Sequence, residues 1–233
     1  MQTKIIFPIA LVALLAAPVS AQPRPQAPPV PQPTTGVQTF ELRPSGISRV
    51  SFTSDAPLET VEGLSSQTTG NFTVDLGNPS ARLSGQVQIT VASLTTGVAM
   101  RDEHLRSANW LDAARHPNIT FEVVRTSIRA VAPGRTARGN VVGRLTLHGQ
   151  AREVTVPVEV RFIPLDPREH AGMDQLGINA NMLRIKGTMR VNLSDFGVNI
   201  MPVLRLKLSN TIAIALDLTS FQTTPAAAAA AGH

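Results

Sequence analysis

Few residues of this 233-residue chain are suited to catalysis, and neither cysteine nor tyrosine is present. Among the five histidines, His104 and His116 are too far apart to resemble the i, i+4 pair of a helical metal site. His104 is better explained as a hydrogen-bonded residue at a domain rim, and His148 falls in a predicted turn. Ser194 and Asp195 lack the glycine-flanked turn of a nucleophile elbow. The sequence therefore predicts neither an enzyme nor a metal site.

A second group with chemical potential is the charged segment around Arg101, Asp102 and Arg106. Asp102 and Arg106 are one helical turn apart, so we expect them to pair on the surface of a helix. The formal net charge is only +5, and basic residues are scattered with few aromatic residues between them. This pattern does not favour a nucleic-acid partner.

The first residues have the three parts of a secretory signal. Lys4 provides positive charge, residues 5–17 are apolar, and small residues end at Ala21, after which we expect cleavage. Residues 22–35 form a proline-rich linker and residues 223–233 an alanine-rich tail, so the folded domain is expected over 36–222. An uncleaved membrane anchor is the weaker alternative, because the apolar stretch is interrupted by Pro8 and is shorter than the roughly 20 residues of a membrane-spanning helix. A periplasmic or secreted protein follows, without a transmembrane anchor after cleavage.

Period-two alternation dominates the domain and predicts strands with one apolar face each. The pattern is clearest at residues 154–162, where Val154, Val156 and Val158 alternate with polar side chains. Single apolar faces favour antiparallel pairing. Further strands are expected at 38–43, 49–53, 70–74, 83–91, 119–124, 144–147 and 189–194, and in one phase from Leu204 to Leu218.

Residues 100–114 break this pattern and predict one short helix, which Pro117 stops. An all-β chain with a helix inserted mid-chain favours a closed antiparallel barrel, which leaves no exposed strand edges. A two-sheet sandwich remains an alternative from alternation alone.

Three motifs carry a resemblance to a known family. MRDEHLRSANWLD at residues 100–112 is followed by His116-Pro117 and by Phe121, GRLTLHG occupies 143–149, and RVNLSDFG occupies 190–197. The chain resembles the YceI-like family over about residues 39–220. The resemblance implies an eight-stranded, lipocalin-like barrel whose long apolar cavity holds an isoprenoid tail or fatty chain.

The function that the resemblance implies is non-enzymatic carriage or storage of a polyisoprenoid or prenyl quinone, with no other cofactor. Arg101 and Arg106 are weaker candidates for contact with a polar headgroup. The residues expected to face the ligand are Val87, Ile89, Val91, Trp110, Phe121, Val123, Leu145, Leu147, Val156, Val158, Met189, Val191, Leu206 and Ile214.

The alternative is an interaction module of the cell envelope, whose barrel is filled by its own side chains. An eight-stranded barrel can be packed or can hold one ligand, so closure does not decide between them. An apolar cavity of several hundred Å³ would favour the binder, and a cavity volume near zero the module. Oligomeric state and ligand headgroup are not indicated by the sequence.

Overall fold

The structure is a computed structural model that describes residues 35–44, 46–166, 170 and 172–223. The expected signal sequence, the linker up to residue 34 and the tail from residue 224 lie outside these residues. The strands are β1 (Val37–Leu42), β2 (Arg49–Asp55), β3 (Thr60–Ser65), β4 (Thr68–Asp75), β5 (Leu83–Thr90), β6 (Asn118–Thr126), β7 (Thr136–Leu147), β8 (Gln150–Ile163), β9 (Met182–Asn192) and β10 (Thr211–Thr223). The helical segments are η1 (Val91–Ser93), α1 (Ala99–Arg106), η2 (Met173–Leu176), η3 (Leu193–Phe196) and η4 (Pro202–Leu204), all but α1 being short 3-10 turns.

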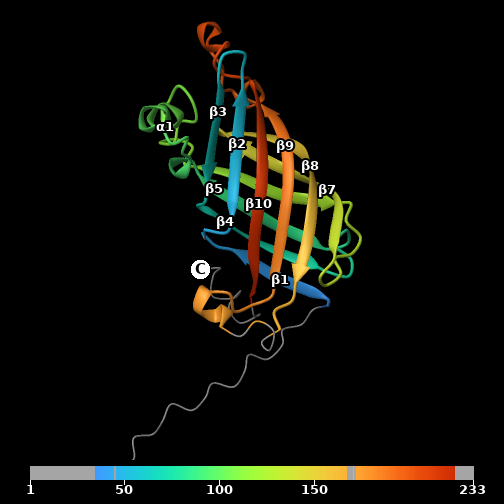
Figure 1. Ribbon diagram of the computed structural model, residues 1–233. Coiled ribbons are helices and arrows are strands. Elements are labelled where there is room, and N and C mark those ends of the chain that lie inside the picture. Colours follow the sequence, from blue (N-terminus) through green and yellow to red (C-terminus); the bar gives the residue numbers. More distant parts are fainter. Residues whose placement is uncertain (1–34, 45, 167–169, 171, 224–233) are drawn as a thin grey trace, which may run out of the picture.

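The strands form a closed antiparallel barrel. Strand β1 pairs with β4, pairing continues in sequence from β4 to β10, and β10 returns to β1, which gives eight barrel positions. The hairpin of β2 and β3 continues the wall beyond β1 and β4, because β2 pairs with the first half of β10. In Figure 1, β2, β10, β9 and β8 form the near wall and α1 lies outside the barrel beside β3. The expected eight-stranded, lipocalin-like fold with one short helix is confirmed.

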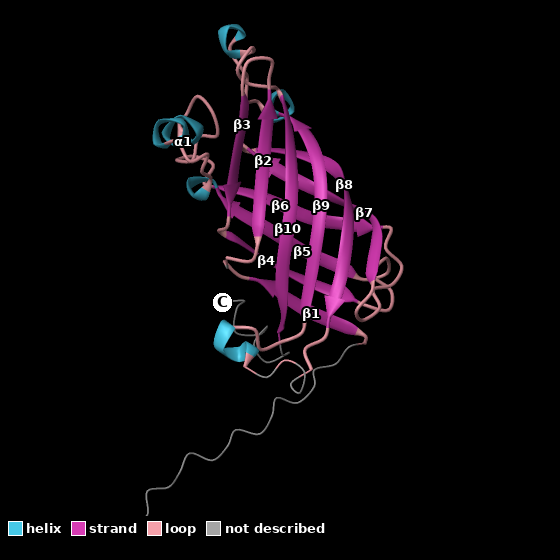
Figure 2. Ribbon diagram, viewed as in Figure 1, coloured by secondary structure: helices cyan, strands magenta, loops and turns pink. Residues whose placement is uncertain are grey.

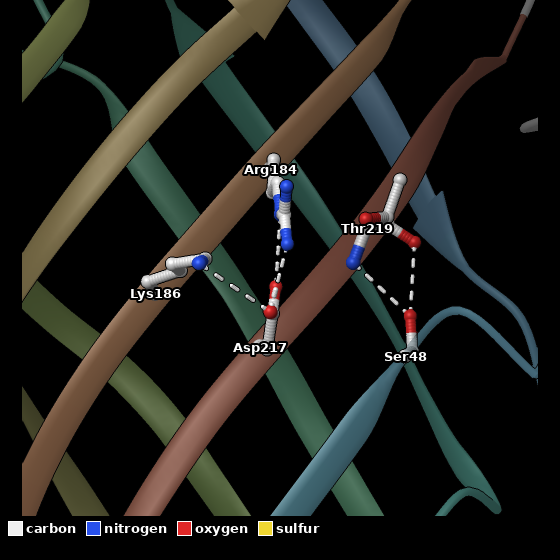
Figure 3. Close-up of polar contacts among 5 residues, drawn as sticks. All are labelled: Ser48, Arg184, Lys186, Asp217 and Thr219. Carbon is white, nitrogen blue, oxygen red and sulfur yellow. Dashed lines mark hydrogen bonds and ion pairs between the residues drawn. The ribbon is translucent and has the colours of Figure 1, made fainter.

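Along strand β10 the pairing partner changes from β2 to β1, and side-chain contacts stabilise this junction. The hydroxyl of Ser48, which is fully buried, accepts the Thr219 N–H at 3.0 Å and donates to the Thr219 carbonyl at 3.2 Å. Nearby, Arg184 of β9 binds Asp217 through two hydrogen bonds of 2.9 and 2.8 Å, and Lys186 lies 3.7 Å from the same carboxylate (Figure 3). The Ser48 hydroxyl thus replaces the strand ladder at this junction, so the buried backbone groups of Thr219 stay satisfied.

Two elements differ from the sequence-based expectation in their bounds. The last strand begins at Thr211 rather than at Leu204, because Pro202 opens a 3-10 turn and residues 205–207 continue it as turns. The helix ends at Arg106 rather than at residue 114, because Ser107 has an extended backbone with a ψ of 164°, and turns follow it.

Strand β3 has no counterpart among the strands predicted from alternation. Its inward positions are Val61, Gly63 and Ser65, all buried, so only one of the three is a large apolar side chain. The period-two signal is correspondingly weak there.

The secondary-structure view in Figure 2 shows that strands alone form the wall of the barrel, while the helical segments lie outside it. Its two ends are packed differently. One end is filled by a buried cluster that includes Phe40, Val131, Val160 and Phe162. Phe40 and Phe162 are both 0 % exposed, and their rings meet edge to face with centroids 6.1 Å apart. The other end carries α1, the β2–β3 turn and η4, and it is hollow.

No helix among the described residues is long and apolar enough to cross a membrane.

Candidate functional site: an apolar cavity in the barrel

The hollow end of the barrel holds a cavity of about 390 Å³. Its wall is almost entirely aliphatic and aromatic, with contributions from strands around the barrel and from the segment that includes α1. The few polar side chains on its lining are Ser54, Thr96, Arg101, His104 and Ser209. A deep apolar space with a few polar groups is typical of a small-molecule binding site.

The structure brings together most of the residues predicted to face a common apolar space. Eight of them alternate along strands, and Trp110 reaches the cavity from the segment after α1. Those that line the cavity are Val87, Ile89, Trp110, Phe121, Leu145, Leu147, Val156, Val158, Met189, Val191 and Ile214.

Three predicted residues lie elsewhere. Val91 follows the end of β5 and is buried in η1, where its N–H donates to the Pro117 carbonyl at 2.8 Å. Val123 borders a register shift between β6 and β7 and packs against the core without lining the cavity. Leu206 is 56 % exposed in the turn before β10. The predictions for Val91 and Leu206 continued the alternation beyond the strand ends.

Two phenylalanine rings on the cavity wall lie over glycines of neighbouring strands. A Cβ on Gly63 would come within 2.3 Å of the Phe52 ring, and one on Gly143 would come within 2.3 Å of the Phe121 ring. Any larger residue at these glycines would have to displace the ring. The glycines therefore position two of the aromatic side chains that shape the cavity.

The α1 segment places charged groups beside the cavity. Arg101 is on the lining and lies 3.4 Å from Glu59 of the β2–β3 turn, while His104 lines the cavity from the same helix. Arg106 does not reach the cavity, because its guanidinium donates to the Leu94 carbonyl at 3.1 Å. Of the two arginines predicted at a headgroup, only Arg101 is in position to contact one.

Asp102 fixes α1 to the barrel, contrary to the predicted pairing on the helix surface. The carboxylate is buried and accepts hydrogen bonds from the Thr95 hydroxyl and from the Thr96 hydroxyl and N–H, each at 2.7 Å. Thr95 in turn exchanges two backbone hydrogen bonds with Leu64 of β3. Burial alone would raise the pKa of Asp102, but these hydrogen bonds and the positive charge of Arg106 hold it below the usual 3.8.

Some cavity residues were missed by sequence reasoning. Phe52 and Phe72 lie on expected strands and Leu111 lies in the segment expected as a helix, so their periodicity could have identified them. Val198 and Ile200 come from an irregular segment that carries no periodic signal. Outside the cavity, Asp112, His116 and His148 also come together, although no metal site was expected from the sequence. The i, i+4 spacing of Asp112 and His116 was the available signal.

Comparison with known proteins identifies a matching family, sequence relatives and solved structures of the same fold. The YceI-like domain model matches residues 41–220. A UPF0312 protein of Vibrio cholerae O395 is 33% identical over 141 residues, which cover 60% of this chain and 66% of that protein. A UPF0312 protein of Pseudomonas putida W619 is 36% identical over 55% of this chain and 59% of its own length. The chain thus spans just under two thirds of the curated relatives it matches.

Solved structures with the same fold include BcnA of Burkholderia cenocepacia, with a TM-score of 0.57 and 23% identity over 74% of this chain and 95% of that one. A polyisoprenoid binding domain from Saccharophagus degradans has a TM-score of 0.58 and 14% identity, over 81% of this chain and 99% of that domain. The family model matches most of the chain, and the barrel fold and the motif around α1 agree with that match. This protein belongs to the YceI-like domain family.

Proposed function

We propose that this protein binds a long apolar molecule, a polyisoprenoid or prenyl quinone, inside the barrel and carries or stores it unchanged. The observation that carries the proposal is the cavity of about 390 Å³ with its apolar wall. A ligand chain in this space leaves water entirely, and each buried CH₂ contributes about 0.8 kcal/mol. The polyisoprenoid binding domain of Saccharophagus degradans, which shares the fold, supports this ligand class.

The orientation of the ligand follows from where the polar groups lie. Arg101 and His104 of α1 are on the lining, whereas the opposite end of the barrel is filled by the cluster around Phe40 and Phe162. An apolar tail would therefore enter first, and a polar headgroup would remain near Arg101. The Glu59 carboxylate, 3.4 Å from Arg101, partly offsets its charge. This favours an uncharged polar headgroup such as a quinone over a diphosphate.

The alternative predicted from the sequence, a packed interaction module, is the weaker proposal. Such a module needs a barrel filled by its own side chains, and a cavity of this volume argues against it. We further propose that the protein acts after export to the periplasm or outside the cell, because residues 1–21 have the pattern of a secretory signal.

Two measurements test the binding proposal. Lipids extracted from natively purified protein and identified by mass spectrometry should include an isoprenoid. Titration with isoprenoid quinones of increasing tail length should show affinity rising by about fourfold per CH₂ buried, equivalent to about 0.8 kcal/mol, until the cavity is full. No bound lipid and no uptake at any tail length would contradict the proposal.

A matched pair of variants assigns binding to the cavity. Ile214 lines the cavity, while its neighbour Ala215 is exposed on the outer wall of the same strand. Ile214→Phe should weaken binding at least tenfold, because the added ring occupies ligand space. Ala215→Phe adds a ring outside the barrel and should bind as the parent does. Equal binding by both variants would place the ligand somewhere other than the cavity.

A further inference from the structure

Three potential metal ligands meet outside the cavity, at the rim of the hollow end. Asp112 and His116 lie in the connection between α1 and β6, and His148 lies in the hairpin turn between β7 and β8. One ligand atom from each lies within 4.8 Å of those of the other two. Carboxylate and imidazole are ligands that Zn²⁺ and other first-row divalent ions accept.

The local backbone brings these residues together. Asp112 and His148 both have positive φ, 45° and 49°, and the His116 N–H donates to the Asp112 carbonyl at 2.7 Å. The His116 ring lies against Gly149, where a Cβ would come within 2.5 Å of it. The two imidazole rings are 5.1 Å apart between centroids. A side chain at residue 149 would displace the His116 ring, so the glycine allows this approach.

A backbone contact fixes the tautomer of one imidazole. Nδ1 of His148 lies 3.2 Å from the Phe196 carbonyl oxygen of η3. A carbonyl can only accept, so Nδ1 carries the hydrogen and Nε2 of the neutral ring keeps its lone pair. Metal-binding histidines commonly donate their other ring N–H to a backbone carbonyl in this way.

The third group is a carboxylate that is almost completely buried. Asp112 is 3 % exposed, and its Oδ2 accepts a hydrogen bond of 2.6 Å from Nε of Arg115. The Arg115 side chain is 76 % exposed, so it can move into solvent without disturbing packing. Arg115 therefore satisfies the carboxylate in place of a metal and would compete with one.

We propose that Asp112, His116 and His148 bind a divalent transition metal ion of the zinc class, with three protein ligands and one open position. The ion would tie the α1–β6 connection to the β7–β8 hairpin. Leu111 and Leu147, the immediate neighbours of two ligands, line the cavity. The metal would therefore restrain two residues of the cavity wall from outside the barrel.

The test uses the full chain without a polyhistidine tag, titrated with Zn²⁺ by calorimetry and with Co²⁺ by visible absorption. The parent should bind one equivalent, and Zn²⁺ should raise its thermal midpoint. His116→Gln and His148→Gln should each lose at least tenfold in affinity. His170→Gln is the control, because His170 lies in another loop and should leave affinity unchanged. Unaltered binding in both cluster variants would overturn the proposal.

Arg115→Ala separates a metal site from a purely structural cluster. Removal of the competing cation should tighten metal binding several-fold, whereas a loss as large as that in His116→Gln would contradict the proposal. If the histidine variants fail to fold, nitrogen NMR of the parent decides instead. Zn²⁺ should shift ring-nitrogen signals of His116 and His148 and leave those of His170 in place, and any other pattern would overturn the assignment.

Discussion

The two ends of the barrel are built from the same alternating strands, but one end is packed and the other is hollow. At the closed end the inward side chains include Phe40 and Phe162, which are fully buried in a packed cluster between the walls. At the hollow end the inward Phe52 and Phe121 rings lie over glycines of adjacent strands and leave the centre open. Alternation determines which face is inward, but the volume of each residue and of its neighbour across the strand determines whether a cavity results.

The largest expected difference between the ends concerns loss of an aromatic ring. Phe162→Ala should lower the free energy of unfolding by about 3 to 5 kcal/mol, because it removes a fully buried ring and leaves a void. Phe121→Ala should cost less, because part of that ring already borders the cavity. Urea denaturation of both variants measures the two losses. Equal losses would indicate that the hollow end is packed as tightly as the closed one.

A larger side chain should destabilise the packed end of the barrel more than the hollow end. Val156 is 2 % exposed and belongs to the packed cluster at the inner limit of the cavity, so Val156→Phe should cost about 1 to 3 kcal/mol through overpacking. Ile214→Phe adds its ring to open space and should leave the unfolding midpoint close to that of the parent. A strong loss of stability in both variants would mean that the cavity cannot accept an added ring.

The wall between β1 and β2, along β10, depends on Ser48. Ser48→Ala should lower the free energy of unfolding by about 1 to 3 kcal/mol, because the buried N–H and carbonyl of Thr219 lose their partner. Ser51→Ala, on the outer wall of β2, is the matched control and should change little. Comparable unfolding midpoints for the two variants would show that the N–H and carbonyl of Thr219 find other hydrogen-bond partners.

The smallest effect we expect is a pH dependence from Asp102 at the hollow end. Its folded pKa is lowered below the ordinary 3.8, so the unfolded chain takes up the proton first. The stabilisation is present above that ordinary value and is lost as the pH falls through the folded pKa. Unfolding midpoints measured from about pH 6 to about pH 3 should fall more steeply for the parent than for Asp102→Asn. Parallel curves would mean that Asp102 does not contribute.

How much could be predicted from the sequence depends on how regular each segment is. From Val154 to Phe162, strand β8 has a large apolar residue at every inward position, so the alternation predicts both the strand and its inward face. Gly63 and Ser65 weaken the alternation of β3, so this strand was not predicted. Leu206 extends the alternation of β10 to residues before Thr211, where the strand has not yet begun. The contacts of Asp102 come from residues before the helix, which no periodic pattern indicates.

The bridge between Leu64 and Thr95 has a consequence for how chains associate. Among the described residues, β3 pairs along its length only with β2, so its other edge is a row of backbone groups suited to adding a further strand. Thr95 occupies this edge at one point, and Glu62 keeps charge on the strand. The Asp102 contacts that hold the α1 segment in place therefore also guard against edge-to-edge aggregation. A chain that lost them would expose a strand edge on which a second copy could pair.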